Sequence, residues 1–220
     1  MHKSIALRYV ATCLLLAGCQ TMASAIGHPT GDTQNWQVHR VQVDDMIVEF
    51  ATPSGESKEF PNFPIPAKLD LSGLDSFDEG GLGPNLLRGF WDYRSSRFAQ
   101  PEGTLSAIIA ARRSSHEIID IESLKRAIRE ASRRFEEKAG VAPKAQDLPT
   151  NYQQITIGGR NVLRVTYKLS SPSYVFLLDN RNYLEVSFQL SDFTNRADWR
   201  ADAQAAADAI LRSIRILPAS

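Results

Sequence analysis

Four strand-like segments in the second half of the chain follow one another with no helix between them. They cover residues 152–157, 160–169, 174–179 and 183–190, and the turns between them are only two to four residues long. Apolar residues alternate with polar ones within these segments, which is the period of a half-buried strand. Parallel neighbours need a crossover of about a dozen residues or more, so connections this short predict an antiparallel meander.

The first half of the chain also predicts paired strands. Residues 36–50 alternate on either side of Asp44-Asp45, which indicates two strands joined by a tight turn. Residues 86–94 and 103–113 predict a second pair. Prolines and glycines interrupt residues 61–84, so we expect a long loop or lobe between the two pairs.

Two amphipathic helices complete the pattern. The first is expected over residues 120–140, with Asp120 as its N-cap and Gly140 as its stop. Its apolar stripe is Leu124, Ile128, Ala131 and Phe135, and its opposite face carries Arg126, Arg129, Arg133 and Arg134 interleaved with glutamates. The second begins near Ala197 and has the stripe Trp199, Ala203, Ala206 and Ile210. Together these elements predict one α+β domain over residues 36–218, a mainly antiparallel sheet covered by two helices.

The start of the chain has the features of an export signal. Lys3 and Arg8 precede a short apolar run that is too short to span a bilayer. The run ends in Leu16-Ala17-Gly18-Cys19, which resembles the lipobox of bacterial lipoproteins. The resemblance implies that the signal peptidase recognises Leu16, Ala17 and Gly18 and that Cys19 receives a diacylglycerol. We therefore expect a signal peptide over residues 1–18 and a flexible tether over 19–35; the alternative is a secreted protein cut near Ala23 or Ala25.

The lipobox resemblance also implies a location. Residue 20 is Gln, whereas Asp after the lipidated cysteine resembles the inner-membrane retention signal of Gram-negative bacteria. We expect an outer-membrane protein that faces the periplasm. The chain has two cysteines, Cys13 and Cys19, so a domain that begins at residue 36 has neither a disulfide nor a cysteine nucleophile.

The order of the elements resembles the PsbP-like fold. A strand pair, an insert, a second strand pair, a helix, a meander and a last helix occur in this order over residues 36–217, and the end reads "YLEVSFQL…W…A…ILRSI". That family includes the photosystem oxygen-evolving subunit P, a Ran-binding nuclear import factor and DcrB-like bacterial lipoproteins. The chain is also similar to accessory and immunity proteins of type VI secretion. The resemblance implies an α-β-α sandwich.

The composition and motifs favour binding over catalysis. The 25 basic and 25 acidic residues become a net charge near −2 once Lys3 and Arg8 are removed, which gives no electrostatic reason to expect nucleic acid. Neither HExxH nor G-x-S-x-G occurs. We expect no enzyme activity and no cofactor. The acidic residues of the lobe do not have EF-hand spacing, so we expect no metal. A periplasmic hydrolase with a carboxylate site stays open as an alternative.

The predicted working surface combines the lobe with the strand that follows it. Within Gly89–Phe98, aromatic residues mix with arginines, a composition enriched in interface hot spots. Alternation places Phe90 and Trp91 on opposite faces, and whichever is exposed would be the anchor. The lobe adds the carboxylates of Asp75, Asp78 and Glu79.

The expected function is therefore that of a non-enzymatic protein-binding lipoprotein. One version is an immunity protein that neutralises a secreted toxin in the periplasm. An envelope assembly or transport accessory is the alternative.

Overall fold

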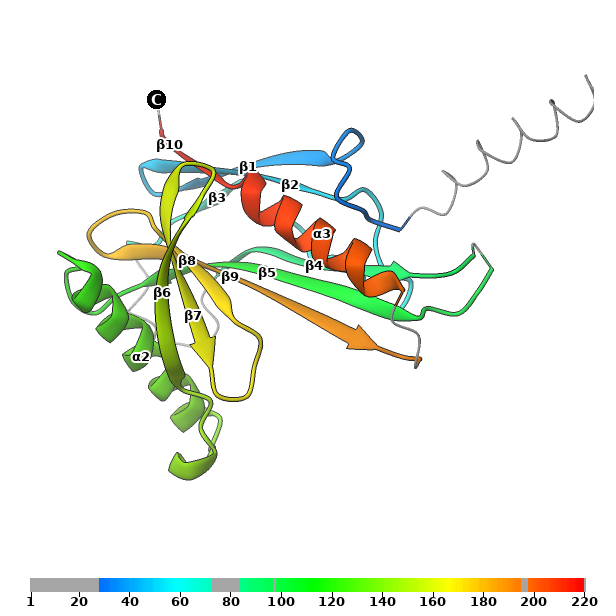
Figure 1. Cartoon of the computed structure of the whole chain (residues 1–220). Helices are drawn as coiled ribbons and strands as arrows, with labels where there is room; N and C mark the ends of the chain where they lie inside the picture. Colours follow the sequence, from blue (N-terminus) through cyan, green and yellow to red (C-terminus); the bar gives the residue numbers. More distant parts are fainter. Residues whose placement is uncertain (1–27, 73–83, 97, 195–197, 220) are drawn as a thin grey trace, which may run out of the picture.

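The computed structural model describes residues 28–72, 84–96, 98–194 and 198–219 (Figure 1). Ten strands and two α-helices lie in these ranges, together with one short 3-10 helix, η2 (Pro143–Ala145). The strands are β1 (Gln37–Val43), β2 (Met46–Thr52), β3 (Lys68–Leu69), β4 (Asn85–Tyr93), β5 (Gly103–Arg113), β6 (Pro149–Ile157), β7 (Arg160–Tyr167), β8 (Ser173–Leu177), β9 (Asn182–Asp192) and β10 (Arg215–Pro218). The helices are α2 (Ile121–Lys138) and α3 (Trp199–Ser213).

The strands form two sheets rather than the expected single one. The first has the order β10-β2-β1-β3 and the second the order β4-β5-β9-β8-β7-β6. Every pair is antiparallel except β1 with β3. The α+β class and the predicted meander from β6 to β9 are confirmed. The first strand pair does not join the second pair; β2 instead pairs with β10 at the end of the chain.

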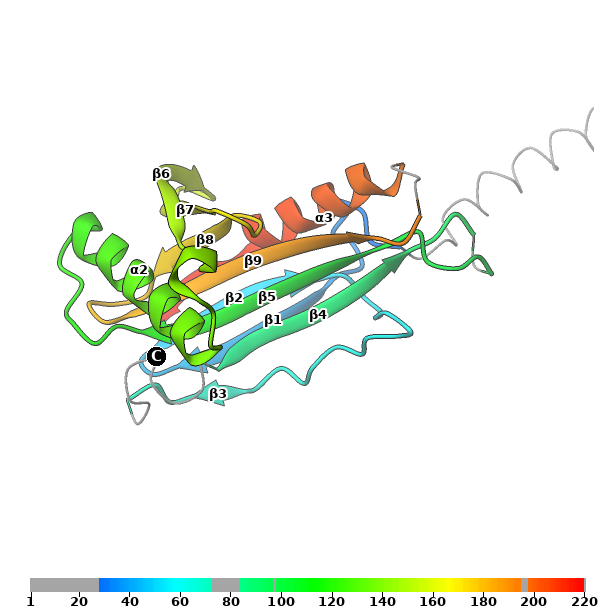
Figure 2. The same cartoon turned by 90° about the horizontal axis from the view of Figure 1, so that it is seen from below.

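The main core lies between the two sheets and α3. Alternate residues of β1 and β2 are buried there, including Val41, Val48 and Phe50. The predicted stripe of α3 is buried, and the helix packs along β2, β5 and β9 (Figures 1 and 2). A continuous apolar layer of this kind accounts for stability in a domain without a disulfide.

Helix α2 packs on the other face of the six-stranded sheet. Asp120 forms the predicted N-cap in a capping box with Ser123, and Gly140 has a φ of 71°, as a C-terminal stop requires. Leu124 and Ile128 are buried against β7, β8 and β9. Phe135 departs from the predicted stripe, because 38% of its surface remains exposed. The C-terminal part of α2 therefore lies over a space that side chains do not fill.

The charged face of α2 is solvated, as its sequence indicates. Arg133 pairs with Glu137 and Arg134 pairs with Glu130, each one helical turn away. The Arg133–Glu137 pair is exposed and stabilises the helix only slightly, whereas the Arg134–Glu130 pair is partly buried.

The last part of the expected tether lies on the domain. The Nε2 atom of His28 is 3.2 Å from the Asp202 carboxylate of α3, and Pro29 is buried. Within the predicted tether of residues 19–35, His28 and Pro29 thus lie on the domain, whereas residues 31–35 are exposed. Residues 19–27 lie outside the described ranges. Neither of the described helices is long and apolar enough to cross a membrane.

Candidate binding face

One face of the six-stranded sheet is only partly covered. Helix α2 covers β7, β8 and the start of β9, whereas none of the described helices covers β4, β5 and the rest of β9 on the same face (Figure 2). We call this region the open face. Cross-strand pairs define its central floor: Ile108 of β5 lies opposite Ser187 of β9, and Ser106 lies opposite Gln189. Small and hydroxylated side chains thus form much of the floor, which leaves it concave.

A groove of about 570 Å³ lies where the open face meets α2. Ile128, Ala131 and Phe135 of the helix form one wall, and the loop after β7 forms another, with Leu169 exposed at its edge. Ser106, Ile108 and Ser187 contribute to the floor. The volume is in the range of about 300–1,000 Å³ that is usual for ligand sites, and the lining mixes apolar walls with hydroxyl groups.

A polar network closes the inner end of the groove. The Arg112 Nε atom is 3.3 Å from a carboxylate oxygen of Glu185, and the Tyr167 hydroxyl donates to the other oxygen at 3.0 Å. The Ser173 hydroxyl is 3.4 Å from that of Tyr167. Burial, and next the negative charge of Glu185, raise the pKa of Tyr167. Tyr167 therefore stays a protonated donor, and Glu185 has two partners that hold its carboxylate in place.

The opposite border of the open face carries an aromatic–arginine cluster, formed by Phe60, Phe63, Arg88 and Phe90. The Arg88 guanidinium carbon is 4.8 Å from the ring centre of Phe63 and 5.9 Å from that of Phe90. The rings of Phe60 and Phe90 are 5.6 Å apart. Phe60 and Phe63 are 45% and 52% exposed. In the register of β4 with β5, Arg88 lies opposite Ile108, so the cluster and the groove share one face.

Backbone hydrogen bonds hold the cluster in place. The segment after β2 runs along the outer edge of β4, where Ser57 N–H donates to Phe90 O at 2.8 Å and Phe63 N–H donates to Arg88 O at 3.0 Å. Phe90 N–H in turn donates to the Asn62 side chain at 2.6 Å. These bonds cover an edge strand that would otherwise be open to pairing. They also fix the two exposed phenylalanines relative to Arg88.

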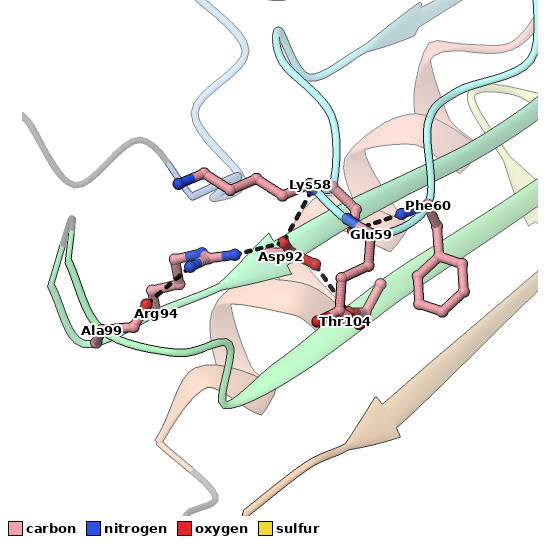
Figure 3. Close-up of polar contacts among 8 residues, drawn as sticks. Lys58, Glu59, Phe60, Asp92, Arg94, Ala99 and Thr104 are labelled. Carbon is pink, nitrogen blue, oxygen red and sulfur yellow. Dashed lines mark hydrogen bonds and ion pairs between the residues drawn. The ribbon is translucent and has the colours of Figure 1, made fainter.

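Asp92 holds the segments together at the β4 end of the border that carries the aromatic–arginine cluster (Figure 3). Its carboxylate accepts bonds from Arg94 Nη2 at 2.8 Å, Thr104 Oγ1 at 3.1 Å and Lys58 N–H at 3.2 Å. Burial raises the pKa of Asp92, but the bonds from Arg94, Ser57, Lys58 and Thr104 outweigh it and hold the pKa below its ordinary value. Asp92 therefore acts as an ionised clamp on segment 57–60 and on the loop after β4.

The predicted site residues are only partly brought together. Phe90 lies on the open face and is half-buried against Phe60, whereas Trp91 is 2% exposed and belongs to the core. Of the two alternatives for the anchor, Trp91 is therefore excluded, because its face of β4 is the face that packs inward. Asp75, Asp78 and Glu79 lie outside the described ranges, as do Leu16, Ala17, Gly18 and Cys19.

Sequence reasoning missed Phe60, and it did not single out Phe63 within the predicted lobe or Arg88 among the arginines near β4. Two phenylalanines next to prolines in a polar loop were the available signal, because a loop has little need of such large apolar side chains. Among the described residues, no group of three or more His, Cys, Asp or Glu side chains has the arrangement of a metal site.

Comparison of the chain with family models, with curated proteins and with solved structures gives no match in any of the three.

Proposed function

We propose that this chain is an outer-membrane lipoprotein whose domain faces the periplasm and binds a protein partner without catalysis. The sequence Leu16-Ala17-Gly18-Cys19 supports the anchor. Two or three acyl chains on Cys19 would hold the protein on the membrane stably, whereas one would not. The PsbP-like relationship is part of the proposal, and the order of strands and helices along the chain supports it.

The observation that carries the binding function is the aromatic–arginine cluster beside the groove. Large exposed phenylalanines around an arginine are the residue types that contribute most to interfaces. Here the backbone bonds of Ser57 and Phe63 to β4 hold them in place, which lowers the ordering cost of binding. The groove supplies a concavity for an apolar side chain of the partner.

The specific version we favour is an immunity protein. An inhibitor needs a rigid complementary surface and a location where the toxin arrives, and the open face and the lipid anchor provide both. The groove supports a second candidate, a transport accessory that carries a small amphipathic ligand, because its volume suits such a ligand.

Site-specific photo-crosslinking in intact cells tests the binding function. A photoreactive phenylalanine at Phe63 should capture a discrete envelope protein or a co-produced toxin. The matched control replaces Val38, which is 65% exposed on the four-stranded sheet. The captured protein is then purified and titrated. Phe63→Ala and Arg88→Ala should each weaken binding about tenfold or more. Unchanged affinity in both folded variants contradicts the proposed surface.

The anchor is tested separately. Cys19→Ser should abolish labelling by a palmitate analogue and leave an unprocessed or soluble chain. Normal labelling of this variant contradicts the lipoprotein assignment.

A further inference from the structure

The chain enters the domain at one end of the molecule, which we call the entry end. The His28 ring lies 5.5 Å from the ring of Tyr93, the last residue of β4, and its Nε2 atom contacts Asp202 in the first turns of α3. His28 is only nine residues after Cys19. Nine residues reach at most about 30 Å and typically about 16 Å if flexible. A lipid on Cys19 would therefore hold the entry end close to the bilayer.

The same end presents two exposed phenylalanines. Phe98 lies in the loop between β4 and β5 and is 95% exposed. Phe193 follows β9, is 50% exposed, and its N–H donates to Glu102 O at 2.9 Å, next to the start of β5. Both views show the β4–β5 loop projecting beyond the ends of the sheets at the entry end (Figures 1 and 2).

The loop that carries Phe98 is held in shape. Arg94 bridges it: its Nη1 donates to Ala99 O at 2.7 Å and its Nη2 donates to Asp92 at 2.8 Å (Figure 3). Ala99 N–H also closes a turn onto Ser96 O at 3.1 Å. Hydrogen bonds thus hold Ser96 and Ala99 near Phe98, and the Phe98 ring is not packed on the domain.

The charges near this end are mixed: Glu59 and Asp198 are exposed, whereas two other carboxylates are paired with arginines. Arg94 is paired with Asp92, and Arg200 is paired with Asp192. The negative charges of Asp92 and Asp192 are therefore already neutralised where they would face lipid phosphates. Figure 3 shows the Lys58 side chain extending on the same side as Arg94 and the loop. Lys58 is exposed and offers an ammonium group to a lipid phosphate.

We propose that the entry end rests on the bilayer and that Phe98 inserts its ring at the boundary between headgroups and acyl chains, with Phe193 beside it. The inference rests on the proposed lipid anchor at Cys19. Phenylalanine is among the apolar side chains that interfacial segments bury at this boundary. One or two rings bind weakly on their own, but the short connection to the anchor makes their insertion an intramolecular event at high effective concentration. The domain thereby acquires a fixed orientation, with the start of α2 at the far end.

Single-cysteine labelling tests the orientation. The described domain has no cysteine, Cys13 is removed with the signal, and the thiol of Cys19 is acylated, so an introduced cysteine is the only reactive one. Phe98→Cys carries an environment-sensitive NBD probe. The matched control is Ile119→Cys, which is 78% exposed just before α2, at the opposite end of the molecule (Figures 1 and 2). Both acylated proteins are reconstituted into vesicles of phosphatidylethanolamine and phosphatidylglycerol.

The probe at residue 98 should shift its emission to shorter wavelength and be quenched by lipids with a nitroxide near the headgroup. The probe at residue 119 should behave as it does in water. If the protein does not float with vesicles, the anchor at Cys19 fails, and this proposal fails with it. If it floats but residue 98 stays water-like, or both probes are quenched equally, the anchor stands and the orientation is overturned. Unchanged unfolding midpoints show that the labelled variants are folded.

Discussion

Replacing Asp92 by Asn tests whether a single ionised carboxylate holds the border of the open face. The substitution keeps the shape of the side chain but removes its charge and one acceptor oxygen. Only 7% of the Asp92 side chain and 17% of the Arg94 side chain are exposed, so water does not easily replace the lost bonds. The new amide NH2 group would also face donors, namely the Arg94 guanidinium or Lys58 N–H.

The size of the effect follows from the bonds that are lost. A hydrogen bond to a charged group contributes about 1.5–3 kcal/mol, and the shortest bond, from Arg94, is of this kind. Loss of a second acceptor position brings the total to about 3 kcal/mol. For a domain of this size that corresponds to a fall in the melting temperature of roughly 6–12 °C. Urea unfolding followed by tryptophan fluorescence measures the difference directly.

The pH dependence of the stability separates the contribution of the Asp92 charge from that of the side chain's shape. The pKa of Asp92 is held below its ordinary value of 3.8, so its ionised form stabilises the folded state. That stabilisation is complete well above pH 3.8 and is lost as the pH falls through the lower, folded-state pKa. The difference between parent and Asp92→Asn should thus be constant above about pH 5 and shrink below pH 3.8.

The control for this experiment is Asp198→Asn, an exposed position that makes no side-chain cap bond to α3. It should change stability by less than about 0.5 kcal/mol at any pH. Two results would refute the role of ionised Asp92 as a clamp. One is a loss in the free energy of unfolding of less than about 1 kcal/mol for Asp92→Asn; the other is a loss that stays constant with pH down to acid unfolding.

Two further substitutions probe the packing and the groove. Gly103→Ala should lower the free energy of unfolding in urea by about 1–3 kcal/mol, because the new Cβ would lie only 2.5 Å from Cη2 of the buried Trp199 ring. A neutral result contradicts the close approach of β5 to α3. Arg112→Met should lower the free energy of unfolding by about 2–3 kcal/mol, because it leaves Glu185 without its cation. Adding Glu185→Leu should recover part of this loss. Equal stability of the single and double variants contradicts a coupled pair.

The elements were predictable where a local signal determines them. Asp120 caps α2 because its short carboxylate reaches the Ser123 N–H, and Gly158-Gly159 turns β6 into β7 because both residues adopt positive φ. Such signals depend on residues a few positions apart. The separation into two sheets was not predictable in this way. It depends on β10 pairing with β2, two segments more than 150 residues apart, and no turn chemistry records that contact.

The site was predictable only through the alternation of β4. That alternation placed Phe90 and Trp91 on opposite faces, but it gave no indication which face packs inward. The answer depends on β5 and α3: Gly103, on the inward face of β5, leaves room for the Trp199 ring, and Tyr93 of β4 stacks on the same ring. The ring partner of Phe90, Phe60, and that of Arg88, Phe63, come from a loop about thirty residues earlier, which is held by backbone bonds that most sequences could make.

If the open face binds a partner as proposed, its side chains define what that partner must offer. The centre is formed by Ile108 together with Ser106, Ser187 and Gln189, whose polar groups are at least partly exposed. The large exposed apolar side chains lie at the two borders, Phe135 over the groove and Phe63 beside Arg88. A large apolar patch in the centre would favour indiscriminate association, whereas separated apolar borders around a polar floor favour a partner that matches both. The partner should therefore place apolar anchors at both borders, with hydrogen-bonding groups over the floor between them, and a segment with one anchor alone should bind only weakly.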